Sequence, residues 1–338
     1  MSSIKLNHIF NPTDVDIGES YYHFLLSIGT ATVIHLDGED ATRCRVFVTL
    51  LHGNEPSGLK ATYAFLKSRK KPKTNVKLII ASVVAASTEP VFTFRMLPGK
   101  KDLNRCFNEA GAECKTKDLQ HELAAAIKEE VVKSQPEAVF DIHNTSGSGP
   151  SFSVSVQESD EHIALVSHFT RRLIITDMRL GSLMEQELGC PVVTIEAGGA
   201  QDDLADETAL RGLISAATSN NIFDPVEDVE LLRQPKRLIL KEKCTINYAE
   251  SPSNDSHVTV RQDVEKLNFG ITEAGFELGW INKGDLSQLN IDSSSEGVDA
   301  FFKLQNNILK TSCPLKFFMV TTRADIAKSD CLFYFVPA

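Results

Sequence analysis

Hydrophobic residues along the chain form continuous runs that alternate with amphipathic stretches. Residues 43–51, 76–86 and 138–143 are apolar or β-branched with few polar interruptions. Such runs are typical of strands that are buried on both faces of a sheet. Two further strands are predicted over 172–176 and 191–196. Amphipathic spacing predicts helices over 58–67, 118–134, 160–169, 181–188 and 203–220.

This alternation of strands and helices predicts an α/β fold, in which a mainly parallel, mixed sheet carries helices on both faces. Ahead of it, the apolar runs 21–28 and 31–36 meet near Gly29, and we interpret them as a β-hairpin. Residues 89–101 are polar and irregular. A loop of this length is expected to have a function of its own.

The pattern changes near Asp224 and Pro225, where charged residues precede a series of short β-type segments. We therefore expect a catalytic α/β domain over 1–225, a boundary near 225–236, and a smaller β-rich domain over 237–338. Its strands are predicted over 237–246, 258–260, 275–281, 315–321 and 332–336, with one helix-like stretch over 297–309.

Charge and cysteine content narrow the classes of function. The chain of 338 residues has 35 Lys and Arg against 45 Asp and Glu, a net charge of −10. This balance argues against nucleic-acid binding as the main role. No stretch approaches the ~20 apolar residues of a membrane span, and no signal-peptide core is evident. The seven cysteines include no Cys-x-x-Cys pair, as expected of reduced thiols in a cytoplasmic protein.

Candidate metal ligands follow the predicted strands. His52 and Glu55 come after the strand over 43–51, and His143 ends the strand over 138–143. The carboxyl ends of parallel strands meet at one edge of a sheet, where ligands bind. Two imidazoles and a carboxylate, with a fourth position open, are the ligand set of a catalytic zinc. A single His-x-x-Glu motif is common in proteins without a metal. The zinc hypothesis therefore depends on the combination of His52 and Glu55 with His143.

Two acids near these residues have alternative interpretations. Glu196 ends the strand over 191–196 and is followed by Ala-Gly-Gly. It is either an ordinary loop carboxylate or a general base, and we favour the base because the glycines allow close backbone approach. Asp141 is either a strand-end cap or the partner that orients an imidazole. Both interpretations of Asp141 remain open.

Three further residues suit an anionic substrate. Asn104 and Arg105 place an amide beside a guanidinium, which can hold a carboxylate by two parallel hydrogen bonds. The alternative for Arg105 is an ordinary surface arginine. Arg95 could supply a cation to a developing oxyanion.

Four motifs together resemble the succinylglutamate desuccinylase/aspartoacylase family, which is grouped with the zinc carboxypeptidases. The resemblance spans roughly residues 40–215. The motifs are His52-Gly53-Asn54-Glu55, Asp102-Leu103-Asn104-Arg105, Asp141-Ile142-His143-Asn144-Thr145 and Ile195-Glu196-Ala197-Gly198.

The resemblance implies a carboxypeptidase-type domain with one zinc ion per chain, held by His52, Glu55 and His143. By position, Glu196 resembles the family's catalytic acid/base, and Asn104 with Arg105 resembles its substrate-carboxylate pair. The family also has an arginine ahead of that pair, which polarises the scissile carbonyl. Arg95 is the candidate, although it lies further upstream than the family's pattern because of an insertion around 98–99.

These observations predict a zinc-dependent hydrolase that cleaves the amide bond of a small N-acyl amino acid. One alternative is a metallocarboxypeptidase acting on peptides or cell-wall fragments, with the same catalytic parts. The two differ in whether the C-terminal domain narrows the mouth of the active site to small molecules, as we expect it to. The alternatives outside the enzymes are a zinc- or ligand-binding protein and a purely structural α/β protein.

Overall fold

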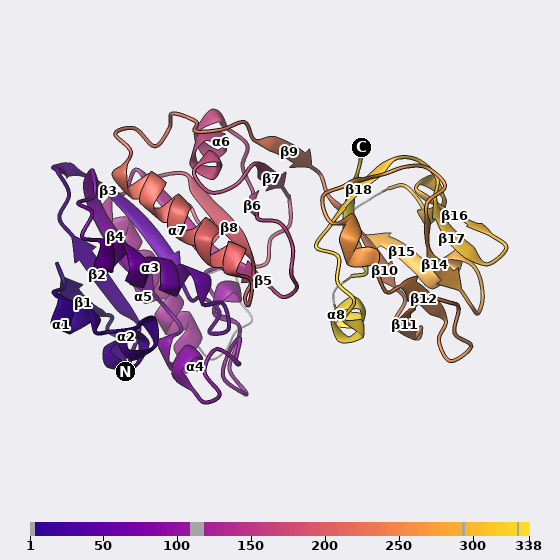
Figure 1. The fold of residues 1–338 in the computed structure, drawn as a ribbon, viewed down its shortest axis with the longest axis horizontal. Coiled ribbons are helices and arrows are strands. Elements are labelled where there is room, and N and C mark those ends of the chain that lie inside the picture. The colour runs from indigo at the N-terminus through magenta and orange to yellow at the C-terminus, as the bar shows by residue number, and fades with distance from the viewer. Residues whose placement is uncertain (1–3, 109–117, 293–294, 330) are drawn as a thin grey trace. The chain divides into compact units, whose positions relative to one another are not determined.

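A computed structural model describes residues 4–108, 118–292, 295–329 and 331–338 of the chain. The chain divides into two compact units, Met1–Leu231 and Leu232–Ala338 (Figure 1). Each unit has its own hydrophobic core.

A nine-stranded mixed sheet forms the centre of the N-terminal unit, in the order β1-β2-β4-β3-β5-β8-β6-β7-β9 among the described residues. The central strands β4, β3, β5 and β8 pair in parallel, and β2–β4 and β6–β8 pair antiparallel. The strands are β1 (Asn7–Phe10), β2 (Thr32–Leu36), β3 (Asp40–Thr49), β4 (Thr74–Ile80), β5 (Ala138–Thr145), β6 (Phe152–Ser155), β7 (Arg172–Ile175), β8 (Val192–Gly199) and β9 (Glu230–Arg233).

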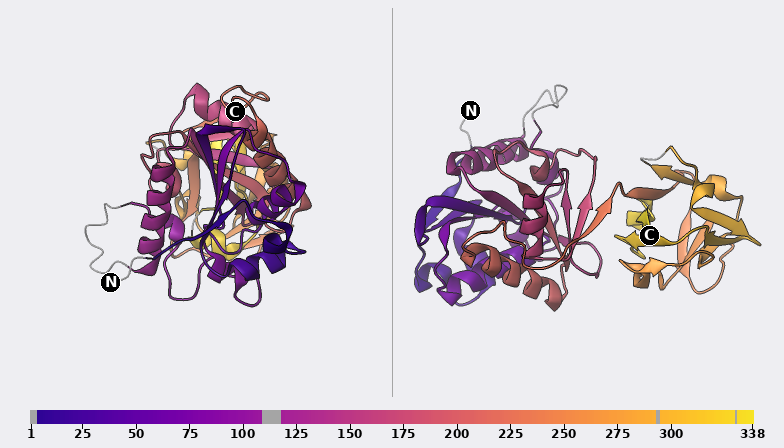
Figure 2. Two further views of the ribbon diagram at one scale, coloured as in Figure 1. Left: turned by 90° about the vertical axis from the view of Figure 1, so that its left-hand side faces the viewer. Right: turned by 90° about the horizontal axis from the view of Figure 1, so that it is seen from above.

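Helices cover both faces of this sheet (Figure 2). Successive residues of β3 point to opposite faces: Phe47 packs in the core cluster shared with α2, α3, α6 and α7, whereas Val46 and Val48 pack in the cluster shared with α5. The arrangement confirms the predicted fold class. The helices are α1 (Asp14–Ile17), α2 (Tyr21–Ile28), α3 (Ser57–Ser68), α4 (Val83–Ser87), α5 (Leu119–Ser134), α6 (Asp160–Ser167) and α7 (Asp203–Thr218).

The predicted hairpin over 21–36 is wrong, because residues 21–28 form α2. Ser20 caps this helix by accepting a hydrogen bond from the His23 N–H, and Gly29 ends it at a φ of 63°. Phe24, Leu25 and Ile28 are buried, at the spacing of one helical face. The apolar run is therefore a helix against the core, and only Thr32–Leu36 is a strand.

The predicted helix over 181–188 is also wrong. Only a 3₁₀ turn, Leu183–Glu185, forms there. The Glu185 carboxylate accepts hydrogen bonds from the backbone N–H groups of Leu180, Gly181 and Ser182, which fixes the segment as a loop. Similarly, the strand predicted over 76–86 ends at Ile80, and Val83–Ser87 forms α4.

The C-terminal unit is β-rich, as predicted. Among its described residues, two five-stranded sheets have the orders β13-β18-β19-β10-β15 and β11-β12-β14-β17-β16. Its elements are β10 (Lys236–Leu240), β11 (Ile246–Ala249), β12 (Val258–Arg261), β13 (Ile271–Thr272), β14 (Glu277–Ile281), β15 (Leu289–Asp292), β16 (Phe302–Gln305), β17 (Ile308–Thr311), β18 (Leu315–Phe318), α8 (Ala324–Ser329) and β19 (Phe333–Pro337).

The helix-like stretch predicted over 297–309 is a hairpin after a short 3₁₀ turn. Asn306 and Asn307 join β16 to β17 with φ values of 51° and 62°. Two consecutive residues with positive φ make the tight turn whose twist matches paired strands, and asparagine tolerates this conformation.

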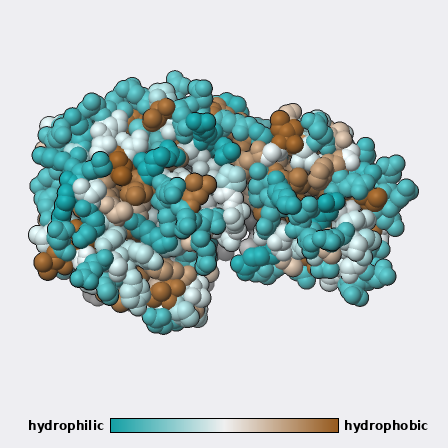
Figure 3. Space-filling view, viewed as in Figure 1, coloured by the Kyte–Doolittle hydropathy of each residue, from teal (hydrophilic) through white to brown (hydrophobic). Residues whose placement is uncertain are grey.

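The face of the molecule in Figure 3 is mostly hydrophilic, with hydrophobic residues in small scattered groups. None of the described helices has both the length and the apolar character needed to cross a membrane.

Candidate active site

The parallel register of three neighbouring strands places the candidate residues at one edge of the sheet. Thr49 of β3 pairs with Ile142 of β5, so the chain leaving β3 reaches His52 close to His143. On the other side, His143 pairs directly with Glu196 of β8. β5 and β8 end at Thr145 and Gly199, slightly beyond the predicted ends, whereas β3 ends at Thr49, before the predicted end at 51. The expected edge is nevertheless the one on which these residues lie.

Two glycines shape the turn that joins β3 to α3. A Cβ atom on Gly53 would lie 2.7 Å from the backbone of Ala86 and of Phe94, and one on Gly58 would lie 2.0 Å from Oγ1 of Thr49. The Gly53 N–H also donates to the carbonyl of Arg95 at 2.9 Å. Only glycine allows these approaches, so the turn presents His52 and Glu55 while packed under the loop over 88–102.

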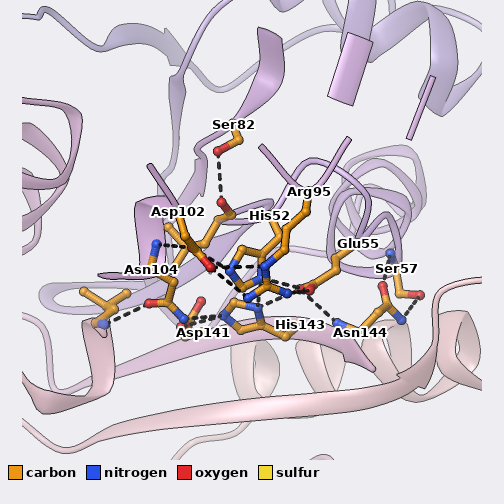
Figure 4. A network of polar contacts seen from close by, with 12 residues as sticks. His52, Glu55, Ser57, Ser82, Arg95, Asp102, Asn104, Asp141, His143 and Asn144 are labelled. Carbon is orange, nitrogen blue, oxygen red and sulfur yellow. Dashed lines mark hydrogen bonds and ion pairs between the residues drawn. The ribbon is translucent and has the colours of Figure 1, made fainter. Parts of the chain in front are cut away.

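The three expected metal ligands lie together and are buried (Figure 4). Nδ1 of His52 is 2.8 Å from Oε1 of Glu55, and Nδ1 of His143 is 2.7 Å from its Oε2. The two Nδ1 atoms are 3.2 Å apart. One potential ligand atom from each residue lies within 4.8 Å of the others. These side chains can therefore bind one cation together.

Each imidazole is oriented by a carboxylate on its other nitrogen. Nε2 of His52 donates to Oδ1 of Asp102 at 2.9 Å, and Nε2 of His143 donates to Oδ2 of Asp141 at 2.8 Å. With the proton on Nε2, each Nδ1 presents a lone pair to the other and to Glu55. Three such lone pairs attract a cation between them, either a metal ion or a proton on an imidazole.

The pKa shifts reflect this crowding of charge. Burial opposes the charged form of His143, but Asp141 and Glu55 raise the pKa of its imidazole well above the usual value. Burial likewise opposes ionisation of Glu55 and Asp102. The adjacent histidines nevertheless lower the pKa of Glu55, and His52 with Arg95 lowers the pKa of Asp102. Both carboxyl groups are ionised at neutral pH, and both favour positive charge on their neighbours.

Asn144 is a positioning residue that the sequence analysis missed. Its backbone N–H donates to Glu55 at 3.3 Å, and its side-chain oxygen accepts the Ser57 N–H at 3.0 Å. Its amide nitrogen donates to Oγ of Ser57 and to the carbonyl of Gly198, each at 2.9 Å. One side chain thus joins β5 to β8 and to the start of α3. Its sequence signal is its place in the motif Asp141-Ile142-His143-Asn144-Thr145, in which the sequence analysis gave no role to this residue.

Arg95 lies within the same network, with its side chain 37% exposed. Its Nε and NH2 groups donate to Oδ2 of Asp102 at 3.1 and 3.0 Å, and its NH1 group donates to Glu55 at 3.3 Å. The loop over 88–102 therefore places a cation beside the ligand cluster.

Asn104 and Arg105 lie on a 3₁₀ turn, Leu103–Arg105, which Asp102 caps. Asn104 is buried; its Oδ1 accepts the Leu183 N–H at 3.0 Å, and its Nδ2 is 3.5 Å from Nε2 of His143. Arg105 is exposed, and its NH1 group donates to the Asn104 carbonyl at 2.8 Å. Of this pair, Asn104 lies beside the cluster and Arg105 presents a guanidinium to solvent.

Glu196 is partly buried and adjoins His143 across the sheet. Burial raises the pKa of its carboxyl group to about 7, although His143 acts in the opposite direction. Within the described residues, its carboxylate forms no hydrogen bond to another side chain. A carboxyl group with this pKa can both accept and return a proton near neutral pH.

Comparisons with known proteins agree with this architecture. A family model described as the succinylglutamate desuccinylase/aspartoacylase catalytic domain matches residues 47–217. None of the curated proteins that were compared matches the chain by sequence.

Several solved structures share the fold. Succinylglutamate desuccinylase from Chromobacterium violaceum is 16% identical with a TM-score of 0.58, over 94% of this chain and 98% of that one. A succinylglutamate desuccinylase/aspartoacylase from Rhodobacter sphaeroides is 12% identical with a TM-score of 0.54, over 87% and 84%. The ectoine utilization protein EutE (DoeB) from Ruegeria pomeroyi, solved with product, is 12% identical with a TM-score of 0.50, over 85% and 82%.

The carboxylate partners of the imidazoles provide a direct test of the cluster. Asp102→Asn and Asp141→Asn should each weaken binding of a divalent metal by about 10- to 100-fold, because the imidazole loses its orienting acceptor. The measurement is titration with Zn²⁺ against a competing chelator. Asp206→Asn is the matched control, since that carboxylate bonds Ser57 and Lys60 instead of an imidazole. Equal affinity in all four proteins would contradict this view of the cluster.

Proposed function

Because this chain belongs to the succinylglutamate desuccinylase/aspartoacylase family, we propose that it is a zinc-dependent hydrolase that cleaves the amide bond of a small N-acyl amino acid. One observation carries the proposal: the Nδ1 atoms of two carboxylate-oriented imidazoles converge with the Glu55 carboxylate. Three protein ligands leave the fourth position of a tetrahedral ion for water or substrate, as in catalytic rather than closed structural zinc sites.

His52, Glu55 and His143 would hold the zinc ion, one per chain. Nitrogen and oxygen donors of this kind are those that zinc takes in catalytic sites. When bound, zinc polarises the amide carbonyl and lowers the pKa of water in the site.

We assign proton transfer to Glu196. Its carboxylate accepts a proton from the attacking water and passes it to the leaving amine nitrogen. The pKa of about 7 suits both halves of this exchange, because the group gains and loses a proton at similar cost. The pairing of Glu196 with His143 in the sheet supports this assignment.

Three side chains would bind and orient the substrate. Arg105 and Asn104 hold its carboxylate, which fixes the amide over the metal ligands. Arg95 stabilises negative charge on the carbonyl oxygen. Its contacts with Asp102 and Glu55 place the guanidinium beside the cluster before substrate arrives, so little reorganisation is needed.

A hydrolysis panel tests the proposal as a whole. N-acetyl and N-succinyl amino acids and short peptides are incubated with the protein, with and without chelator, and amine release is measured. We expect turnover of the N-acyl amino acids, loss of turnover with chelator, and recovery on adding Zn²⁺. Preference for peptides would favour the alternative, a metallocarboxypeptidase, and would argue against a C-terminal unit that narrows the mouth of the site. Binding without turnover would favour a ligand-binding protein.

Glu196→Gln should keep metal binding and lower kcat by about 10²- to 10⁴-fold, since the amide cannot accept the proton. In the unaltered enzyme, kcat/KM should rise with pH through an apparent pKa at or below about 7, because the base must be deprotonated. The variant's residual activity should lack this acidic limb. A variant with near-normal kcat and the same pH profile would remove Glu196 from the mechanism.

Arg105→Ala should raise KM for carboxylate-bearing substrates by about 10- to 100-fold, the effect of losing charge-assisted hydrogen bonds. Substrates whose carboxylate is replaced by an amide should be affected much less. Arg171→Ala, which removes a 73% exposed arginine paired with Glu227, serves as the control. An equal effect on both kinds of substrate would show that Arg105 does not bind the carboxylate.

A further inference from the structure

A second cluster of metal-binding side chains lies at the β1 edge of the large sheet. His8 of β1, His35 of β2 and Glu130 of α5 each offer a ligand atom, and these atoms lie within 4.8 Å of one another. None of these residues belongs to the candidate active site. The described part of the chain thus brings together three donors from three separate elements, with no role in the proposed reaction.

Strand register and ring stacking position the two imidazoles. β1 and β2 pair in parallel with Phe10 opposite His35, and His8 lies two residues before Phe10 on the same side of β1. The Phe10 ring stacks on the His35 ring at 4.3 Å between centroids. Nδ1 of His8 is then 2.9 Å from Nε2 of His35. Two nitrogens bound to one Zn²⁺ ion in tetrahedral geometry are about 3.3 Å apart, so a small adjustment would suffice.

The third donor lies on the same face of the sheet, where it is paired with a lysine. Lys77 of β4 pairs with His35 in the antiparallel register, and its ammonium contacts Oε1 of Glu130 at 2.6 Å. The side chain of Glu130 is only 12% exposed.

We propose that His8, His35 and Glu130 form a second site for a borderline divalent cation such as Zn²⁺ or Ni²⁺, which links the edge strand β1 to β2 and α5. Two imidazoles and one carboxylate favour these ions over Mg²⁺ or Ca²⁺, which prefer oxygen ligands. β1 has four residues and pairs with one neighbour, so a cation shared with α5 would hold the strand more firmly. The site is independent of the proposed function.

The number of zinc ions bound per chain tests the inference. After dialysis against Zn²⁺ and removal of free ion, the full chain should retain two equivalents. His8→Ala and His35→Ala should each retain one, whereas His23→Ala, which removes an exposed histidine of α2, should retain two. His143→Ala should lose the other equivalent. If His8→Ala and His35→Ala retain as much zinc as the unaltered chain, the second site does not exist.

The same experiment separates this inference from the proposed function. A chain that binds one equivalent, lost in His8→Ala but kept in His143→Ala, supports the second site and argues against the catalytic one. A chain that binds one equivalent, lost in His143→Ala but kept in His8→Ala, supports the catalytic site and argues against the second site.

Lys77 provides a test in which affinity should improve. Lys77→Met removes a positive charge next to the bound cation and frees the Glu130 carboxylate, so the affinity of the second site for Zn²⁺ should rise about tenfold. The catalytic equivalent should be unaffected. Unchanged or weaker affinity would contradict the assignment of Glu130 as a ligand.

Discussion

The candidate site depends on the parallel pairing of three adjacent strands, β3, β5 and β8. Their carboxyl ends lie at one edge, and side chains on neighbouring strands face each other there without any long-range adjustment. A slip of one residue in β5 would turn His143 to the opposite face and remove it from both His52 and Glu196. Buried residues on both faces, such as Phe47 against one layer and Val48 against the other, make such a slip costly.

Excess negative charge is the second constraint on the site. The imidazoles of His52 and His143 and the guanidinium of Arg95 lie among four acidic side chains. These are Glu55, Asp102, Asp141 and Glu196. Buried negative charge is stable only when it is paired. The Arg95 guanidinium supplies part of the compensation through Asp102 and Glu55. Asp141 and Glu55 raise the pKa of His143, whereas burial is the main cause of the raised pKa of Glu196 and the charge of Glu55 adds to it.

Much of this arrangement could be predicted from sequence, because buried parallel strands have a strong signal and their ends determine where polar groups meet. His52, Glu55 and His143 follow that rule directly. Other features depend on contacts between distant segments. The role of Asn144 requires Ser57 and Gly198 to be neighbours, and that of Asp102 requires a loop to fold back over His52. The predicted helix over 181–188 fails for the same reason, because Leu183 bonds to Asn104 instead of continuing a helix.

The contact between Gly53 and the backbone of Arg95 has a consequence for how the family's loops can vary. The hydrogen bond joins the carbonyl of Arg95 to the turn that carries His52, so the guanidinium and the metal ligand are anchored to each other through the main chain. Beyond that anchor, the loop passes through Gly99, around which a side chain would meet nothing within 4 Å. We expect that residues inserted there would not displace Arg95, because the Gly53 N–H holds its carbonyl on one side and Asp102 holds its guanidinium on the other. The number of residues between the turn and Arg95 is then less informative about the position of the guanidinium than the main-chain hydrogen bond that fixes it.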